Sequence, residues 1–298
     1  MSAFIQACAS GVVTGCVYAL VGLSIALIYK STDIINFAGG EMVMIGSYLC
    51  LYGLVVLGWS YPVLVPLVAL IVAALAAGFD RIVIDRVVGR AVPGQSIQVA
   101  LVICTVGLSY MLKGGVRVFP YTEEVRRLPP LFSGEPVFLG TTILQRQDIA
   151  IVVIAVLLML GWWLFFSFTL AGKALRATSE NPRAAALIGI PVRIMRAVGW
   201  GIAALIAAVA GILLGPKLLM TPDMGAVVIL GFAAAIVGGF SSLFGCIVGG
   251  IVVGILQNLV GIYVSSQAIS VTPFVIIMLV LALRPQGLFG GRVVAKKV

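Results

Sequence analysis

The sequence lacks histidine and a phosphate-binding loop, and it has few charged residues. None of its 298 residues is His, and only 10% are Asp, Glu, Lys or Arg. The absence of His excludes Ser-His-Asp and Cys-His nucleophilic sites, HExxH zinc sites and histidine proton relays. No segment reads GxxxxGK[ST], so ATP used by the protein has to be bound by another chain.

Cysteine is also scarce. The five residues are odd in number, include no CxxC pair and all lie in apolar runs. This pattern favours small buried side chains over disulfides or metal ligands. The five are Cys8, Cys16, Cys50, Cys104 and Cys246.

What dominates instead is apolar sequence. Hydrophobic residues make up 62% of the chain, against roughly 45–50% in soluble domains. A helix needs about 20 apolar residues to cross a bilayer, so we predict one all-α domain, residues 1–298, a polytopic transmembrane helix bundle of about eight to nine spans. The nine segments, of which the short ones could be re-entrant, are 4–29, 42–58, 62–79, 96–112, 148–170, 195–215, 224–240, 245–264 and 268–283.

The charges predict an orientation. Nineteen Lys and Arg against ten Asp and Glu give a net charge of +9, and basic residues gather in segments 80–90 and 173–196 and in the tail after 283. Such clusters are typical of cytoplasmic loops and not of a nucleic-acid surface. The nearly balanced, proline-containing connection 113–147 is predicted outside. These placements put the N-terminus outside and the C-terminus inside.

Glycine is frequent, at 35 residues, and much of it must lie within helices. Pairs spaced by four predict close helix contacts, and a glycine-lined gate is the alternative. The pairs are Gly11/Gly15, Gly211/Gly215, Gly245/Gly249 and Gly250/Gly254.

A weak internal repeat is present. Lys30 and Asp33 follow one apolar segment, and Lys217 and Asp223 follow a later one in the same order. Since the predicted topology places these connections on opposite sides, an inverted repeat with a site near the midplane would explain them. Coincidence between two pairs of charges is the alternative.

A first motif, residues 31–41, interrupts apolar sequence with polar residues, two glycines and Glu41. A broken helix there would expose backbone groups able to bind a solute. The alternative is that Asp33 or Asn36 caps the next helix while Glu41 lies near its positive end.

A second motif covers residues 172–190. Asn181 can cap a helix, Pro182 suits its first position and Gly189 can end it. We predict a short amphipathic helix on the cytoplasmic side, suited either to docking on a partner protein or to connecting two spans. A third motif, residues 238–250, predicts a glycine turn between spans whose role is packing.

Together these motifs resemble the permease subunits of branched-chain amino acid ABC importers, often called LivH-type. The resemblance also includes residues 128–132, 209–213 and 285–290, and it covers nearly the whole chain. The family usually reads Asn-Phe-Ala-His-Gly-Glu where residues 36–41 have Gly39 at the His position.

The resemblance implies the ABC importer permease fold and a set of functional residues. It implies a cytoplasmic coupling segment, 173–193, that contacts an ATPase. We expect Asn36, Phe37, Gly39, Gly40 and Glu41 to line the solute pathway. The expected coupling residues are Arg176, Ala177, Glu180, Asn181, Pro182, Arg183, Ala184, Ala185 and Gly189.

The resemblance also implies partners and a location. The chain would form the pathway with a second homologous permease, in the bacterial cytoplasmic (inner) membrane, with two cytoplasmic ATPase subunits and an external solute-binding protein. It would contact lipid and no nucleic acid. It would bind no cofactor and not be an enzyme, since ATP and Mg²⁺ belong to the ATPase subunits.

Two other classes compete. A stand-alone gradient-driven secondary transporter or channel needs ionisable residues in the membrane for coupling, and only Asp33, Glu41, Lys217 and Asp223 lie near spans. A membrane-embedded enzyme needs a cluster of nucleophiles or metal ligands, which scattered carboxylates without His do not supply.

Overall fold

The structure is a computed structural model that describes residues 2–32, 34–90, 96–118, 127–139 and 142–290. Nine apolar helices match the nine predicted segments within a few residues. Six are long and apolar enough to cross a membrane in the described part of the chain, and α2, α10 and α12 are shorter. The nine are α1 Ser2–Thr32, α2 Gly39–Val55, α3 Tyr61–Phe79, α5 Ile97–Arg117, α6 Arg146–Phe168, α9 Val192–Leu214, α10 Val228–Gly238, α11 Leu243–Tyr263 and α12 Thr272–Leu283.

Smaller elements connect these helices. A π-helical turn, η1, and α4 continue α3, and two short helices, α7 and α8, lie between α6 and α9. The sequence did not predict the two-stranded antiparallel hairpin that precedes α6. The bounds are η1 Asp80–Ile84, α4 Asp85–Gly89, α7 Leu170–Glu180, α8 Pro182–Leu187, the 3₁₀ turns η2 Met224–Val227 and η3 Ser266–Ile269, β1 Val137–Leu139 and β2 Thr142–Leu144.

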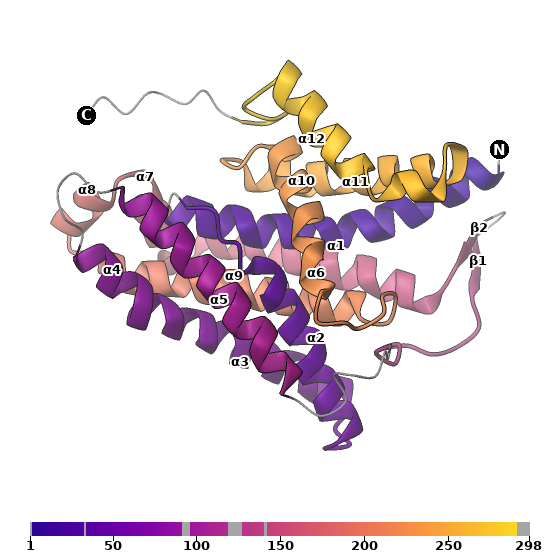
Figure 1. Cartoon of the computed structure of the whole chain (residues 1–298), viewed down its shortest axis with the longest axis horizontal. Coiled ribbons are helices and arrows are strands. Elements are labelled where there is room, and N and C mark those ends of the chain that lie inside the picture. The colour runs from indigo at the N-terminus through magenta and orange to yellow at the C-terminus, as the bar shows by residue number, and fades with distance from the viewer. Residues whose placement is uncertain (1, 33, 91–95, 119–126, 140–141, 291–298) are drawn as a thin grey trace.

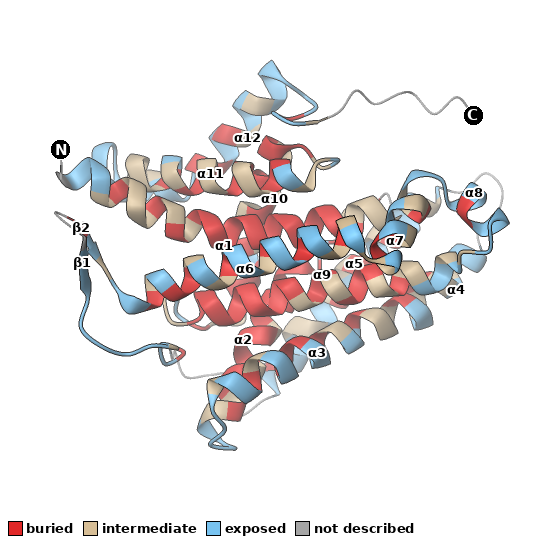
Figure 2. Ribbon diagram, turned by 180° about the vertical axis from the view of Figure 1, so that it is seen from behind, coloured by how far each residue is buried: buried red, intermediate tan, exposed pale blue. Residues whose placement is uncertain are grey.

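Helices α1 and α9 form the centre of the bundle. In their most apolar stretches 89% and 83% of the residues are buried, against 22–39% for α3, α5, α6 and α11. Figure 2 shows α1 and α9 largely buried between helices with exposed outer faces. The outer helices therefore present apolar surface to lipid or to partner subunits.

Glycine pairs hold α11 against α1. A Cβ on Gly254 would lie 2.4 Å from the backbone nitrogen of Gly15, and one on Gly15 would lie 2.7 Å from Cα of Ile251. Nδ2 of Asn258 donates a hydrogen bond to Oγ1 of Thr14 at 2.9 Å across this contact. The predicted role of these glycines in close packing is confirmed.

The bundle has two distinct ends (Figure 1). One carries the start of α1 and the hairpin, which Gln6 joins through two 2.9 Å hydrogen bonds with the backbone of Ile143. We call it the hairpin end. The other carries α4, α7 and α8 and is the α7–α8 end. The basic residues of segments 80–90 and 173–196 lie in or next to η1, α4, α7 and α8 and at the start of α9.

Two predicted boundaries need correction. The connection 113–147 is not all loop, because α5 continues to Arg117 and α6 begins at Arg146. The predicted coupling segment consists of two helices and not one, since the backbone at Asn181 is extended (φ −149°, ψ 95°) and separates α7 from α8. Some residues behind these predictions lie outside the described residues: Asp33 of the internal repeat, and Arg292, Lys296 and Lys297 of the basic tail.

Candidate solute pathway and coupling segment

Two short helices begin beside each other inside the bundle. After α1 ends at Thr32, the chain turns back, so that a Cβ on Gly39 would lie 3.7 Å from both Ile25 of α1 and Val228 of α10. From the other direction, the chain leaves α9 at Leu214 and enters η2 and then α10. We call the contact between the starts of α2 and η2 the helix-start junction.

Glycines allow this junction to close. A Cβ on Gly40 would lie 1.9 Å from the carbonyl oxygen of Gly225, so position 40 has no room for a larger residue. From the junction α2 runs to the hairpin end, where Gly53 contacts Leu64 at the start of α3. Helix α10 crosses α1 (Figure 1) and leads to the opposite end, where Phe240 packs on Tyr29. Two half-helices that begin together and diverge are the arrangement that an inverted repeat predicts.

Asn36 is buried in the turn before α2. Its Oδ1 accepts a 3.0 Å hydrogen bond from the backbone N–H of Ala38, and its side chain is not the helix cap, because the cap position is Ala38 itself. Its Nδ2 has no hydrogen-bond partner among the described residues. Asn36 therefore keeps a free donor, which the capping alternative did not predict.

Phe37 is the exposed member of the motif, at 42%. Its ring lies 6.0 Å from that of Phe232 on α10, and its backbone N–H points at Oγ1 of Thr105 on α5 at 3.5 Å. The turn 34–38 thus presents an aromatic surface between α5 and α10.

Glu41 is in the first turn of α2 and is 5% exposed. Nζ of Lys113, on α5, lies 3.9 Å from Oε1 of Glu41 and 3.4 Å from Oδ1 of Asp223. Oε2 of Glu41 has no hydrogen-bond partner in the described part of the chain. We call Glu41, Lys113 and Asp223 the charged cluster; it borders the helix-start junction, because Gly225 lies against Glu41.

This arrangement can hold both charges of a zwitterion. Lys113 offers an ammonium donor, and two carboxylates stand on either side of it. The start of α2 adds partial positive charge. No group of three His, Cys, Asp or Glu side chains that could hold a metal ion occurs among the residues described.

The coupling segment projects from the α7–α8 end (Figure 1). Oδ1 of Asn181 accepts a 3.0 Å hydrogen bond from the N–H of Ala184, Pro182 is in the first turn of α8, and Gly189 has φ +86°. The predicted cap, first-turn proline and terminating glycine are all confirmed. Arg176, Ala177 and Glu180 belong to α7, whereas Ala185 is the buried residue of α8.

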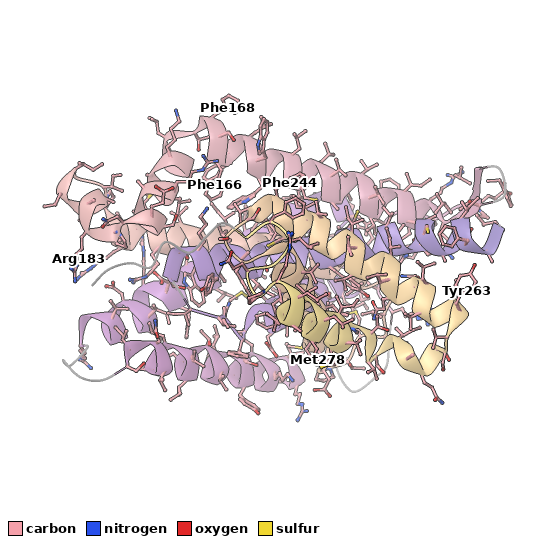
Figure 3. All side chains as sticks on the ribbon, turned by 90° about the horizontal axis from the view of Figure 1, so that it is seen from above. Phe166, Phe168, Arg183, Phe244, Tyr263 and Met278 are labelled. Atoms are coloured by element: carbon pink, nitrogen blue, oxygen red, sulfur yellow. The ribbon has the colours of Figure 1, made fainter. Side chains whose placement is uncertain are left out.

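Leu187 and Ile188 end α8 with large exposed side chains, at 88% and 75%. Arg183 lies on the same projection, as Figure 3 shows. An apolar tip with a basic edge is the surface that a groove on a partner protein would accept.

Comparison with known proteins decides the family. Residues 7–283 match the family described as branched-chain amino acid transport system, permease component. The chain belongs to this family. It is a multi-pass membrane permease, and transport rather than catalysis is the role of such subunits.

Two individual relatives match nearly the whole chain in sequence, and a third matches part of it. The high-affinity branched-chain amino acid transport system permease protein LivH of Escherichia coli K12 is 33% identical over 98% of this chain and 97% of its own. BraD of Pseudomonas aeruginosa, described in the same words, is 31% identical over 98% of both chains. The autoinducer 2 import permease LsrC of an Enterobacter species is 28% identical over 63% of this chain and 51% of its own.

A solved structure supports the fold. PsaBC from Streptococcus pneumoniae, in complex with a Fab, superposes with a TM-score of 0.53 at 15% identity and covers 95% of the permease and 92% of that chain. At this identity the match concerns the fold alone.

An ion-pair network joins the start of α9 to η1 and α4. Arg196, near the start of α9, donates from Nε to Oδ1 of Asp80 at 2.8 Å and from Nη2 to Oδ1 of Asp85 at 2.9 Å. Arg193 lies 3.5 Å from the same Asp85 oxygen. The π-helical turn η1 lies between the two acids, with the N–H of Asp85 bonded to the carbonyl of Asp80. This widened turn brings both carboxylates within reach of one guanidinium.

Sequence reasoning missed several of these residues. Lys113 was placed in the external connection, whereas α5 continues through it to Arg117. Asp223 was considered as a repeat marker and as one of four ionisable residues near the spans, and Thr105 and Asp80 were not considered. The signal that was available is a charge inside or beside an apolar span, which is costly unless it is paired or functional.

Proposed function

We propose that the permease conducts a branched-chain amino acid or a closely related small solute past the charged cluster. The observation that carries this is the meeting of two half-helix starts beside Glu41, Lys113 and Asp223. The solute carboxylate would bind Lys113 and the helix starts, and its ammonium would bind Glu41 or Asp223. The free donor of Asn36 and the exposed ring of Phe37 complete the lining.

The pathway holds the solute weakly, and this suits a permease. Nζ of Lys113 lies 3.4 Å from Oδ1 of Asp223 and 3.9 Å from Oε1 of Glu41. Both distances are longer than those of a tight ion pair. Gly39 and Gly40 contribute close packing and no side-chain contact to the solute. Discrimination among solutes then belongs to the external binding protein.

We further propose the assembly and orientation. ABC partner subunits follow from the family; the composition proposed is a second homologous permease, two cytoplasmic ATPase subunits that bind ATP and Mg²⁺, and an external solute-binding protein. The basic α7–α8 end would face the cytoplasm of a bacterial inner membrane, and the hairpin end the outside. Leu187 and Ile188 would enter a groove on the ATPase.

Two substitutions test the pathway. Glu41→Gln and Asn36→Ala remove a buried charge and a free donor, and each should lower solute uptake while the assembled complex is still recovered. Glu135→Gln makes the same chemical change on an exposed loop and should leave uptake unchanged. Normal uptake in both test variants would remove these residues from the pathway.

Two further variants test coupling. Gly189→Pro cannot adopt φ +86°, and the double change Glu180→Lys/Arg183→Glu reverses the charges of the segment. Both should abolish solute-stimulated ATP hydrolysis by the assembled transporter while the membrane subunits remain folded. Normal hydrolysis and uptake in both would refute the coupling role.

The same preparation tests the assembly. Purification of the permease in mild detergent should recover a second permease and two ATPase chains in fixed ratio. Recovery of this chain alone, under conditions that keep other membrane complexes intact, would instead favour a gradient-driven transporter.

A further inference from the structure

A crevice of about 630 Å³ lies between α1, α6, α7 and α11, away from the charged cluster. Apolar side chains such as Leu23, Leu160 and Ile247 form most of its wall. Figure 3 shows Phe166 on α6 and Phe244 on α11 at neighbouring positions along it. Its size is typical of a ligand site, and it faces outward from the permease.

The polar groups of this crevice are hydrogen-bond donors. Lys30 comes from the last turn of α1, Arg176 from α7, and Trp162 from α6. Trp162 is 7% exposed, and its Nε1 has no hydrogen-bond partner among the described residues. Ammonium, guanidinium and indole N–H groups all donate and none accepts.

Neither cation forms an ion pair with a carboxylate among the described residues. Within the described ranges no carboxylate lies within 4.0 Å of Lys30 or Arg176. Glu180 of α7 is close enough to attract the Lys30 ammonium electrostatically, and Arg176 is close enough to repel it. Among the described residues, two cations and one acid leave a net positive charge at the end of an apolar crevice, which calls for an anion with an apolar body.

We propose that this crevice binds an anionic phospholipid of the leaflet next to the α7–α8 end. The lipid phosphate would accept hydrogen bonds from Lys30 and Arg176, and an ester or glycerol oxygen would accept one from Trp162. The acyl chains would follow the apolar wall along Leu160 and Ile247. Basic pockets between transmembrane helices bind acidic headgroups for this reason, and a zwitterionic lipid is disfavoured because its own ammonium is repelled.

Bound in this way, the headgroup joins α1 to α7. It would therefore hold the first part of the coupling segment against the bundle. This inference concerns lipid and does not depend on which solute is carried or on whether the charged cluster lines the pathway.

Tryptophan quenching by brominated lipids tests the site. The assembled transporter in mild detergent is mixed with phosphatidylglycerol or phosphatidylcholine carrying brominated acyl chains. The Trp162 and Trp163 signal is obtained by subtracting the same measurement on Trp162→Phe/Trp163→Phe. Phosphatidylglycerol should quench this signal at an about tenfold lower lipid fraction than phosphatidylcholine.

Matched variants separate site binding from general charge attraction. Lys30→Gln/Arg176→Gln should abolish the preference, and Lys30→Arg/Arg176→Lys should keep it. Lys173→Gln/Arg284→Gln removes the same charge from exposed positions outside the crevice and should also keep it. Glycerol phosphate in solution should not displace the brominated lipid.

Four results would overturn the proposal. These are equal quenching by the two lipids, a preference that survives Lys30→Gln/Arg176→Gln, displacement by glycerol phosphate, and no quenching by either lipid. The third would indicate a soluble anion as the occupant, and the fourth would indicate that a protein subunit covers the crevice. None of the four bears on solute uptake, so the proposed function stands or falls separately.

Discussion

The charged cluster and the ion-pair network each place one cation between two carboxylates, yet they differ in how tightly it is held. In the network, Arg196 lies 2.8 and 2.9 Å from its partners, and Asp80 is fully buried. In the charged cluster, Lys113 lies 3.4 and 3.9 Å from its partners, and Asp223 is largely exposed. The network is closed and buried, whereas the charged cluster is looser and partly exposed, as its proposed contact with the solute requires.

Geometry explains the difference. A planar guanidinium has donors spaced to reach two acids at once, and the π-helical turn brings those acids together. A lysine ammonium is a compact charge on a flexible stem. Because Glu41 and Asp223 come from separate helix starts, no local turn can draw them onto it.

Breaking the network should cost the most stability. Asp80→Asn or Arg196→Ala leaves a buried charge without its partner, which destabilises by about 3–5 kcal/mol. We expect a lower midpoint of thermal unfolding of the detergent-solubilised complex and little recovered protein. An unchanged midpoint in Arg196→Ala would show that the buried pair does not support the fold.

Neighbouring glycines at the helix-start junction should respond unequally. Gly40→Ala places a Cβ 1.9 Å from a backbone oxygen and should destabilise by about 1–3 kcal/mol or more. Gly39→Ala meets only ordinary contacts at 3.7 Å and should leave the unfolding midpoint unchanged or slightly raised. Equal effects of the two changes would mean that the junction is not closed as described.

Lys113→Gln should affect transport more than stability. Loss of a charge-assisted contact to the solute is worth about 1.5–3 kcal/mol, so uptake should fall about tenfold or more. The unfolding midpoint should fall less than in Arg196→Ala, since Nζ of Lys113 lies 3.9 Å from the buried Glu41, whereas Nε of Arg196 donates to Asp80 at 2.8 Å. A large loss of stability with normal uptake would make the charged cluster a second structural network.

Arg193→Ala should have the smallest effect. Its side chain is 78% exposed and lies 3.5 Å from Asp85, so its contribution should be below about 1 kcal/mol. Arg193 and Arg196 both contact Asp85, the first from an exposed and the second from a buried position. Measuring the unfolding midpoints of Arg193→Ala and Arg196→Ala therefore compares the two contacts directly. Similar losses in both would contradict the central role given to Arg196.

The order of the helices was readable from the sequence, because crossing a bilayer requires long apolar runs. The cap at Asn181, the proline after it and the end at Gly189 were also predictable, since each is a local rule of helix termini. The break between α7 and α8 was not recognised, although Asn181 and Pro182 indicated a start there and therefore an end just before.

By itself, the sequence determined the composition of the spans, their approximate limits, the basic end of the molecule and the family. The tertiary structure alone decided that Lys113 meets Glu41 and Asp223, that Arg196 bridges Asp80 and Asp85, and that Gly40 touches Gly225. The reason is physical: apolar length and helix caps depend on neighbours along the chain. Each of these contacts instead joins residues far apart in sequence, and no spacing rule relates them.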